Sequence, residues 1–160
     1  KRGLYTFSEL SNKPEVILFF ANRIYRPSYI SLHSALAFYG MIPEAVIQIN
    51  SVTSLKTSSF VNQFGSFTYQ SVRPELMFGY ELKPIADGRA VQIATPEKAL
   101  LDLLYLYSFY NNSEEIEQLR LDEDFMSRDF NWSLCDEYAA RFQSKVIIQR
   151  VKFLKKLYKI

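Results

Sequence analysis

The sequence predicts an α+β fold, in which helices stand before and after a mainly antiparallel sheet and the chain ends in a long basic amphipathic helix. The apolar residues follow a helical period up to about residue 39, a β-rich pattern from 46 to 94, and a helical period again from 95. The chain has 160 residues, of which 48% are hydrophobic and 22% charged. These values are typical of a globular chain that forms one domain, or one domain with a helical appendage.

The first two helices are expected at about residues 14–23 and 32–39. Pro14 suits the first turn of a helix, because its missing N–H has no helical partner there in any case. Ser31 is the expected N-cap of the second helix, and Gly40 is the expected residue in the left-handed conformation after its end.

The central part of the chain predicts strands and hairpins. Residues 46–54 are rich in β-branched side chains and partly alternate between apolar and polar. The dipeptide Asp87-Gly88 between two β-rich stretches is a strong hairpin signal. The expected strands are the end of one at 1–7, then 46–54, a hairpin of 58–62 with 66–72, and a hairpin of 80–86 with 90–94, with a single helical turn near 74–77.

The strongest helix signal begins at Thr95. Thr95 is the expected N-cap, Pro96 occupies the first helical position, and Glu97 complements the positive end of the helix dipole. A short acidic helix is expected at 113–120, and one long helix at about 135–158. The outer face of that last helix is expected to carry Lys145, Arg150, Lys152, Lys155, Lys156 and Lys159.

The formal net charge of +2 conceals a strong asymmetry. Residues 1–110 carry +2, residues 111–140 carry −7, and residues 141–160 carry +7. The basic helix could therefore pack on the acidic 111–137 segment or simply be solvated. Alternatively, it could bind phosphate groups, an anionic membrane surface or an acidic protein.

Few residues suggest catalysis. A single cysteine, Cys135, and a single histidine, His33, argue against a disulfide, a zinc site or a hydrolytic triad. No phosphate-binding glycine motif is present. A metal-dependent nuclease would need carboxylates on adjacent strands, and Glu81 faces a strand, 90–94, that has none. We therefore expect no enzyme activity, cofactor or metal, and keep a nuclease as the alternative from another class.

A second group of charged residues lies on or near the helix that begins at Thr95. Lys98 and Asp102 are four residues apart, so they are expected to form a surface pair worth about 0.2–0.5 kcal/mol. Together with Glu97 and Arg73 they are also candidates for a contact with a domain or partner.

Five sequence blocks follow one another in a fixed order and spacing: KRGLY at 1–5, ANRIYRPSYISLHSAL at 21–36, YGMIPE at 39–44, FGSFTY at 64–69 and ATPEKALLDLLY at 94–105. In order and spacing they resemble the AbiEi family. These proteins are antitoxins and predicted transcriptional regulators of bacterial abortive-infection, type IV toxin–antitoxin systems. The resemblance covers about residues 1–110, and beyond them only the helical character is similar.

The resemblance implies a longer protein whose successive segments have different functions. An upstream winged helix-turn-helix would bind operator DNA and repress the operon, with residues 1–7 as the end of its wing. Residues 8–110 would form the AbiEi-like core, and residues 111–160 a helical part packed on it. The family counteracts a nucleotidyltransferase toxin, with or without a direct complex. The resemblance gives no catalytic residues to assign to this chain. The family often has an acidic residue at the position of His33.

These observations lead to the expectation of a cytoplasmic, non-enzymatic effector domain that does not act at a membrane. Its contact surface would be the basic last helix, which neutralises phosphates or acidic side chains. The remaining alternative is a scaffold that makes the DNA-binding domain a homodimer.

Overall fold

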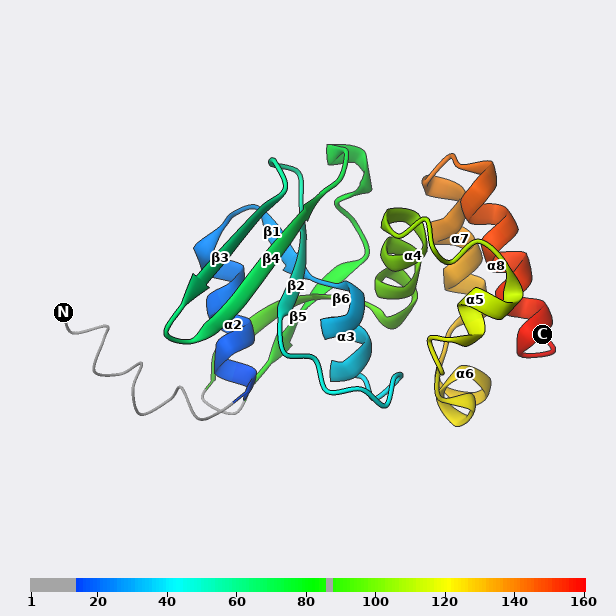
Figure 1. The fold of residues 1–160 in the computed structure, drawn as a ribbon, viewed down its shortest axis with the longest axis horizontal. Coiled ribbons are helices and arrows are strands. Elements are labelled where there is room, and N and C mark those ends of the chain that lie inside the picture. Colours follow the sequence, from blue (N-terminus) through cyan, green and yellow to red (C-terminus); the bar gives the residue numbers. More distant parts are fainter. Residues whose placement is uncertain (1–13, 86–87) are drawn as a thin grey trace.

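The computed structural model describes residues 14–85 and 88–160, which form an α+β fold (Figure 1). The expected wing remnant at 1–7 lies outside the described residues. Within these residues, no helix combines the length and the apolar character needed to cross a lipid bilayer. The elements in chain order are α2 (Pro14–Ile24), β1 (Ser28–Ile30), α3 (Leu32–Phe38), β2 (Ile49–Thr53), β3 (Ser58–Asn62), β4 (Gly65–Ser71), the 3-10 turn η1 (Pro74–Leu76), β5 (Tyr80–Pro84), β6 (Ala90–Ala94), α4 (Pro96–Leu106), α5 (Ser113–Glu117), α6 (Glu123–Arg128), α7 (Trp132–Arg141) and α8 (Lys145–Leu157).

The strands form one sheet in the order β3-β4-β2-β1-β6-β5. Three of its strand pairs are antiparallel, and they include both predicted hairpins, β3 with β4 and β5 with β6. The pairs β1 with β6 and β2 with β4 are parallel. The sheet is therefore mixed but mainly antiparallel, as the sequence predicts.

Strand β1 at the centre of the sheet was not predicted. It has three residues, all of them buried, so it offers no alternation between a polar and an apolar face. Tyr29 pairs with Val52 of β2, and Ile30 pairs with Ile93 of β6. This short strand joins the two hairpins into one sheet and fixes the direction of the Tyr29 side chain.

Helices cover both faces of the sheet. The Tyr69 hydroxyl of β4 donates a hydrogen bond to the Ala21 carbonyl, which places α2 on one face. The Tyr29 hydroxyl donates a hydrogen bond to Asp102 of α4. Tyr29 pairs with Val52, and Val52 pairs with Gln70, the neighbour of Tyr69, so Tyr29 and Tyr69 point to opposite faces and α4 lies on the face opposite α2. Helix α3 lies on the same face as α4 and packs against it.

Helix α4 lies between the sheet and the C-terminal helices (Figure 1). Its N-cap is the predicted one, because the Thr95 Oγ1 accepts a hydrogen bond from the Lys98 N–H at 3.2 Å. Every residue from 97 to 104 is buried, so α4 has no solvent-exposed arc along most of its length. One hydrophobic cluster consequently extends from the sheet through α4 to α8.

The long last helix that the sequence predicts is instead two helices. α7 ends at Arg141, the backbone of Gln143 adopts a left-handed φ of 51°, and α8 begins at Lys145. Ser144 caps the new helix by accepting a hydrogen bond from the Ile147 N–H. No glycine or proline marks the break, so the apolar period alone suggested continuity. The short helix α6 was also not predicted.

Candidate functional site

One face of α8 carries a row of lysines. At about 100° per residue, Lys145, Lys152 and Lys156 fall within a narrow arc of the helix, and Lys159 follows just beyond its end. All four residues are exposed, and none forms an ion pair with another residue that the structure describes. We call Lys145, Lys152, Lys156 and Lys159 the lysine face.

The lysine face is bordered by apolar and polar side chains. Val146 is 53% exposed and Ile148 is 39% exposed, which is high for aliphatic side chains on a packed helix. Ile148 also lines a groove of about 440 Å³ between the end of α7 and α8, together with Lys145 and Lys152. The outer surface of α8 thus combines positive charge with accessible apolar area.

The other side of α8 packs on the acidic part of the chain. Its buried residues contact α5, α7 and α4, and they are Ile147, Arg150, Val151 and Leu154. The ammonium group of Lys155 lies 2.6 Å from the carboxylate of Asp136 in α7. The basic helix therefore packs on the acidic segment through an apolar stripe and this ion pair, while the lysine face is directed outward.

Arg150 does not belong to the outer basic face, and the expectation that it does was wrong. The residue is only 6% exposed. Its guanidinium donates hydrogen bonds to main-chain and side-chain oxygens at the end of α4, namely the carbonyls of Leu104, Tyr107 and Ser108 and the Oδ1 of Asn111. Arg150 therefore supplies donors to carbonyls at and just beyond the end of α4, where a helix leaves carbonyls without intrahelical partners.

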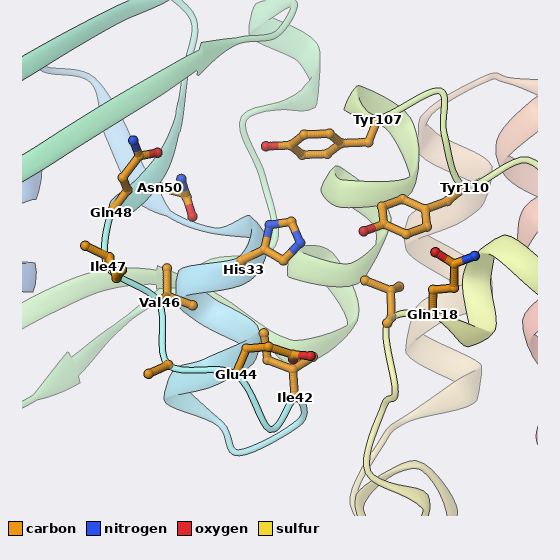
Figure 2. Close-up of a pocket in the computed structure, with 12 residues that line it drawn as sticks. His33, Ile42, Glu44, Val46, Ile47, Gln48, Asn50, Tyr107, Tyr110 and Gln118 are labelled. Carbon is orange, nitrogen blue, oxygen red and sulfur yellow. The ribbon is translucent and has the colours of Figure 1, made fainter.

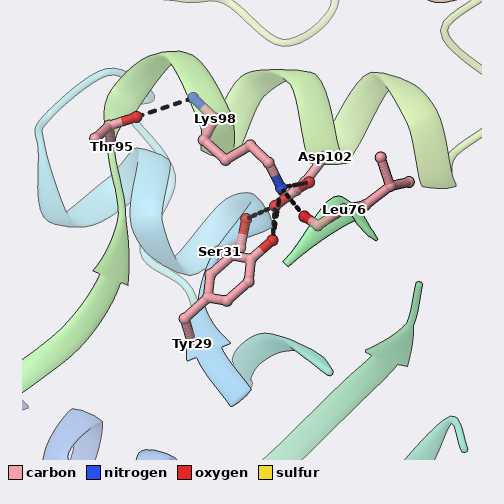
Figure 3. Close-up of polar contacts among 6 residues, drawn as sticks. All are labelled: Tyr29, Ser31, Leu76, Thr95, Lys98 and Asp102. Carbon is pink, nitrogen blue, oxygen red and sulfur yellow. Dashed lines mark hydrogen bonds and ion pairs between the residues drawn. The ribbon is translucent and has the colours of Figure 1, made fainter. Parts of the chain in front are cut away.

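Lys98 and Asp102 form a buried pair, so the predicted surface pair was also wrong. Both side chains have no solvent exposure, and Lys98 Nζ lies 2.6 Å from Asp102 Oδ1 (Figure 3). The ammonium also donates to the Tyr29 hydroxyl at 2.7 Å and to the Leu76 carbonyl at 2.8 Å. These three acceptors use all three N–H groups of the lysine.

The Asp102 carboxylate is equally well paired. Its Oδ2 accepts hydrogen bonds from the Tyr29 hydroxyl and from the Ser31 hydroxyl, each at 2.8 Å. Ser31 is at the N-cap position of α3, as predicted, but its side chain makes no capping hydrogen bond and is used here instead. Burial raises the pKa of Asp102 and lowers the pKa of Lys98, and each partner opposes the shift of the other.

Aromatic rings and a glycine complete the surroundings of Lys98. Its Nζ lies 4.6 Å from the centroid of the Phe78 ring and 5.3 Å from that of Phe142. Gly79 has a φ of +72°, and a Cβ there would lie 2.9 Å from Lys98 Cγ. Because no atom of the ion pair is exposed, this cluster holds β1, η1 and α4 together and does not meet a ligand from solution.

Glu97 and Arg73 connect the sheet half of the protein to the C-terminal helices. Glu97 is 4% exposed, and its carboxylate accepts a hydrogen bond from the Asn131 N–H at the start of α7. The exposed Arg73 donates to the Phe142 carbonyl, beside the break between α7 and α8. Both side chains thus make contacts within this chain.

The other residues considered for chemistry lie apart from one another. Cys135 is fully buried, and burial raises the pKa of its thiol to about 12, so the thiol is protonated at neutral pH. Glu81 forms an ion pair with Lys83 at 3.0 Å. In the described ranges, no cluster of three or more histidine, cysteine, aspartate or glutamate side chains is arranged to hold a metal ion.

Comparisons with protein-family models and with curated proteins find no match for this chain.

Proposed function

We propose that this chain is the non-enzymatic effector domain of a cytoplasmic AbiEi-type antitoxin and repressor, and that it counteracts a nucleotidyltransferase toxin through the lysine face. The observation that supports this proposal is the outward row of lysines on α8, which remain without acidic partners in the described chain although a −7 segment lies next to them in the sequence. Operator binding is left to the winged helix expected upstream.

The spacing of the lysines suits an extended contact. Lys145 and Lys156 are separated by about 16 Å along the axis of α8, given a rise of about 1.5 Å per residue. Positive charges spread over that length attract an anionic surface and orient it before contact. A solvated row of lysines makes little difference to the stability of the fold, so its charge is available for recognition.

The apolar side chains beside the row favour a protein partner over a nucleic acid. A phosphate backbone offers charge but no apolar surface with which to cover Val146 and Ile148. A protein surface with carboxylates beside apolar side chains would pair with the lysines and cover Ile148, which lines the groove with Lys145 and Lys152. We therefore propose an acidic patch on a partner protein, the toxin itself in the simplest case.

A charge-reversal variant tests this proposal in cells. The protein that contains this chain is co-expressed with the nucleotidyltransferase-type toxin encoded beside its gene, either unchanged or with Lys145→Glu, Lys152→Glu and Lys156→Glu. The matched control carries Arg26→Glu, Lys56→Glu and Arg128→Glu, three exposed positions away from α8. Three reversals take the formal charge of the chain from +2 to −4 in both variants.

We expect the α8 variant to lose toxin neutralisation and the control variant to retain it, with equal melting temperatures. Direct contact is measured by calorimetry between the purified toxin and each variant. If the α8 variant still neutralises the toxin, the assignment of the lysine face is overturned. If the α8 variant still binds the toxin but loses binding to nucleic acid, the proposal of a protein partner is overturned.

A further inference from the structure

A cavity of about 660 Å³ opens where the sheet half of the protein meets the helical half (Figure 2). One wall is formed by α3 and the segment 42–48, and the opposite wall by the residues after α4 and the end of α5. Its size lies within the range of about 300–1,000 Å³ that is usual for small-molecule sites. None of the residues that line it belongs to α8, so the cavity is separate from the lysine face.

Most of the polar side chains that line the cavity have no hydrogen-bond partner among the described residues. Five of them form no hydrogen bond with any residue in the described part of the chain: His33, Gln48, Tyr107, Tyr110 and Gln118. In Figure 2 both tyrosine hydroxyls point from one wall across the cavity toward the wall that carries His33. Their donors and acceptors are therefore available to a ligand.

The described residues that line the cavity bring no unpaired charge to it. Glu44 lines it, and its carboxylate forms an ion pair with the guanidinium of Arg120. The imidazole of His33 is half-buried, and burial lowers its pKa, so it is neutral at pH 7. Such surroundings favour an uncharged ligand that is rich in hydrogen-bonding groups over a free anion or a metal ion.

The shape of the lining favours a planar ligand. The rings of His33 and Tyr107 have centroids 5.7 Å apart, and those of Tyr107 and Tyr110 are 6.5 Å apart, with interplanar angles of 73° and 72°. Each pair is therefore arranged edge to face, and all three rings line the cavity. The amides of Gln48 and Gln118 each offer an acceptor and two donors, which can pair with the edge of a heterocycle.

We propose that this cavity binds a purine or pyrimidine base. A base stacks on tyrosine or histidine rings, and side-chain amides read the donors and acceptors along its edge. The base could belong to a free nucleoside or nucleotide, or it could be an unpaired base of a single strand. The chemistry in the cavity is the same, but a strand would also place phosphates on the surrounding surface.

The test uses calorimetry and ligand-observed NMR with the four ribonucleosides, their 5′-monophosphates and single-stranded RNA pentamers. The cavity variants are the double variant Tyr107→Phe with Tyr110→Phe, and the single variant Gln118→Ala. The control is a second double variant, Tyr80→Phe with Tyr138→Phe, because these two tyrosines lie outside the cavity. Both double variants remove two hydroxyls and keep the rings, so folding should be preserved.

We expect at least one nucleoside to bind with a Kd of about 1 mM or tighter. The cavity double variant should weaken binding about tenfold, and the control should not change it. If pentamers bind more tightly than nucleosides, and their affinity falls with added salt, the natural ligand is a base within a strand. Equal affinities for nucleosides and pentamers indicate a free ligand.

The proposal is overturned if neither nucleosides nor pentamers bind at about 5 mM, a concentration that would reveal even a very weak site. It is also overturned if binding is unchanged in both cavity variants. The charge reversal at Lys145, Lys152 and Lys156 should leave nucleoside binding as it is. The proposal for the cavity and the proposal for the lysine face can therefore be confirmed or overturned independently.

Discussion

Lys98 of α4 and Asp102, one turn later on the same helix, form an ion pair with an N–O distance of 2.6 Å and no solvent exposure on either side chain. A buried pair of this kind adds little net stability, because desolvation offsets most of the attraction. Its partners are nevertheless tightly linked, since either charge left alone would be buried without compensation. Three further groups share the network, so it connects β1, η1 and the N-terminus of α3 to α4.

The first prediction concerns the energetic coupling of this pair. Asp102→Leu leaves the Lys98 ammonium without its counter-charge, and it should lower the free energy of unfolding by about 3–5 kcal/mol. The double variant Lys98→Met with Asp102→Leu removes both charges and should lose less than the sum of its two single variants. Urea denaturation of the four proteins gives the coupling energy as a double-mutant cycle. Additive losses would show that the two side chains are independent.

A second prediction concerns Gly79, which touches the same network. Its φ of +72° costs a residue with a Cβ about 1–2 kcal/mol, and that Cβ would lie 2.9 Å from Lys98 Cγ. Gly40 has a φ of +73° with nothing within 4 Å, so it shares the backbone conformation without the contact. Gly79→Ala should therefore be less stable than Gly40→Ala by about 1–3 kcal/mol in chemical denaturation. Equal losses in the two variants would mean that Lys98 moves aside freely.

The sequence was informative where the signals are local. The cap at Thr95, the turn at Gly40 and both hairpins follow from residue types at adjacent positions, and the structure confirms them. The burial of Lys98 had no such signal. Lys98 and Asp102 fall in the arc that the alanine and leucines of α4 leave open, which is typical of a solvated face, and tertiary packing covers that arc.

Other features have no local signal. The parallel strand pairs, the short strand β1 and the break at Gln143 depend on tertiary packing. The cavity combines His33 with residues near 110 and 118, which only tertiary packing, including that of α3 on α4, brings together. Within α8, however, helical geometry alone places Arg150 well away from the arc of Lys145 and Lys152.

The third prediction separates the structural arginine of α8 from its outer lysines. Arg150→Ala removes donors from the carbonyls of Leu104, Tyr107 and Ser108, and the buried Leu104 carbonyl loses its hydrogen bond from the guanidinium. It should lower the free energy of unfolding by about 2–3 kcal/mol. Lys152→Ala on the same helix is exposed and should change stability by less than about 0.5 kcal/mol.

Thermal and urea denaturation of the two alanine variants would check this contrast. Arg150→Lys is a useful third protein, because an ammonium cannot reach as many acceptors as a guanidinium, and an intermediate loss is expected. Wild-type stability in Arg150→Ala would contradict the structural role and return the residue to the candidates for partner binding.

The fourth prediction concerns stability at alkaline pH. Burial raises the pKa of the Cys135 thiol from 9.0 to about 12, and it raises the pKa values of Tyr69 and Tyr158 to about 12. Above about pH 9 the unfolded chain releases the thiol proton while the folded chain retains it. The unfolded state then binds fewer protons, so the free energy of unfolding falls as the pH rises and this contribution is lost by about pH 12.

The variant Cys135→Ala isolates the thiol from the tyrosines. Between about pH 9 and 11 its free energy of unfolding should fall less steeply than that of the unchanged protein, by up to about 1.4 kcal/mol per pH unit. Comparing slopes removes the constant cost of the smaller side chain, which acts at every pH. Below about pH 8 the thiol is protonated in both the folded and the unfolded state, so the slopes of the two proteins should coincide there. Parallel curves at alkaline pH, or rapid alkylation of the native thiol at pH 8, would contradict a buried and protonated Cys135.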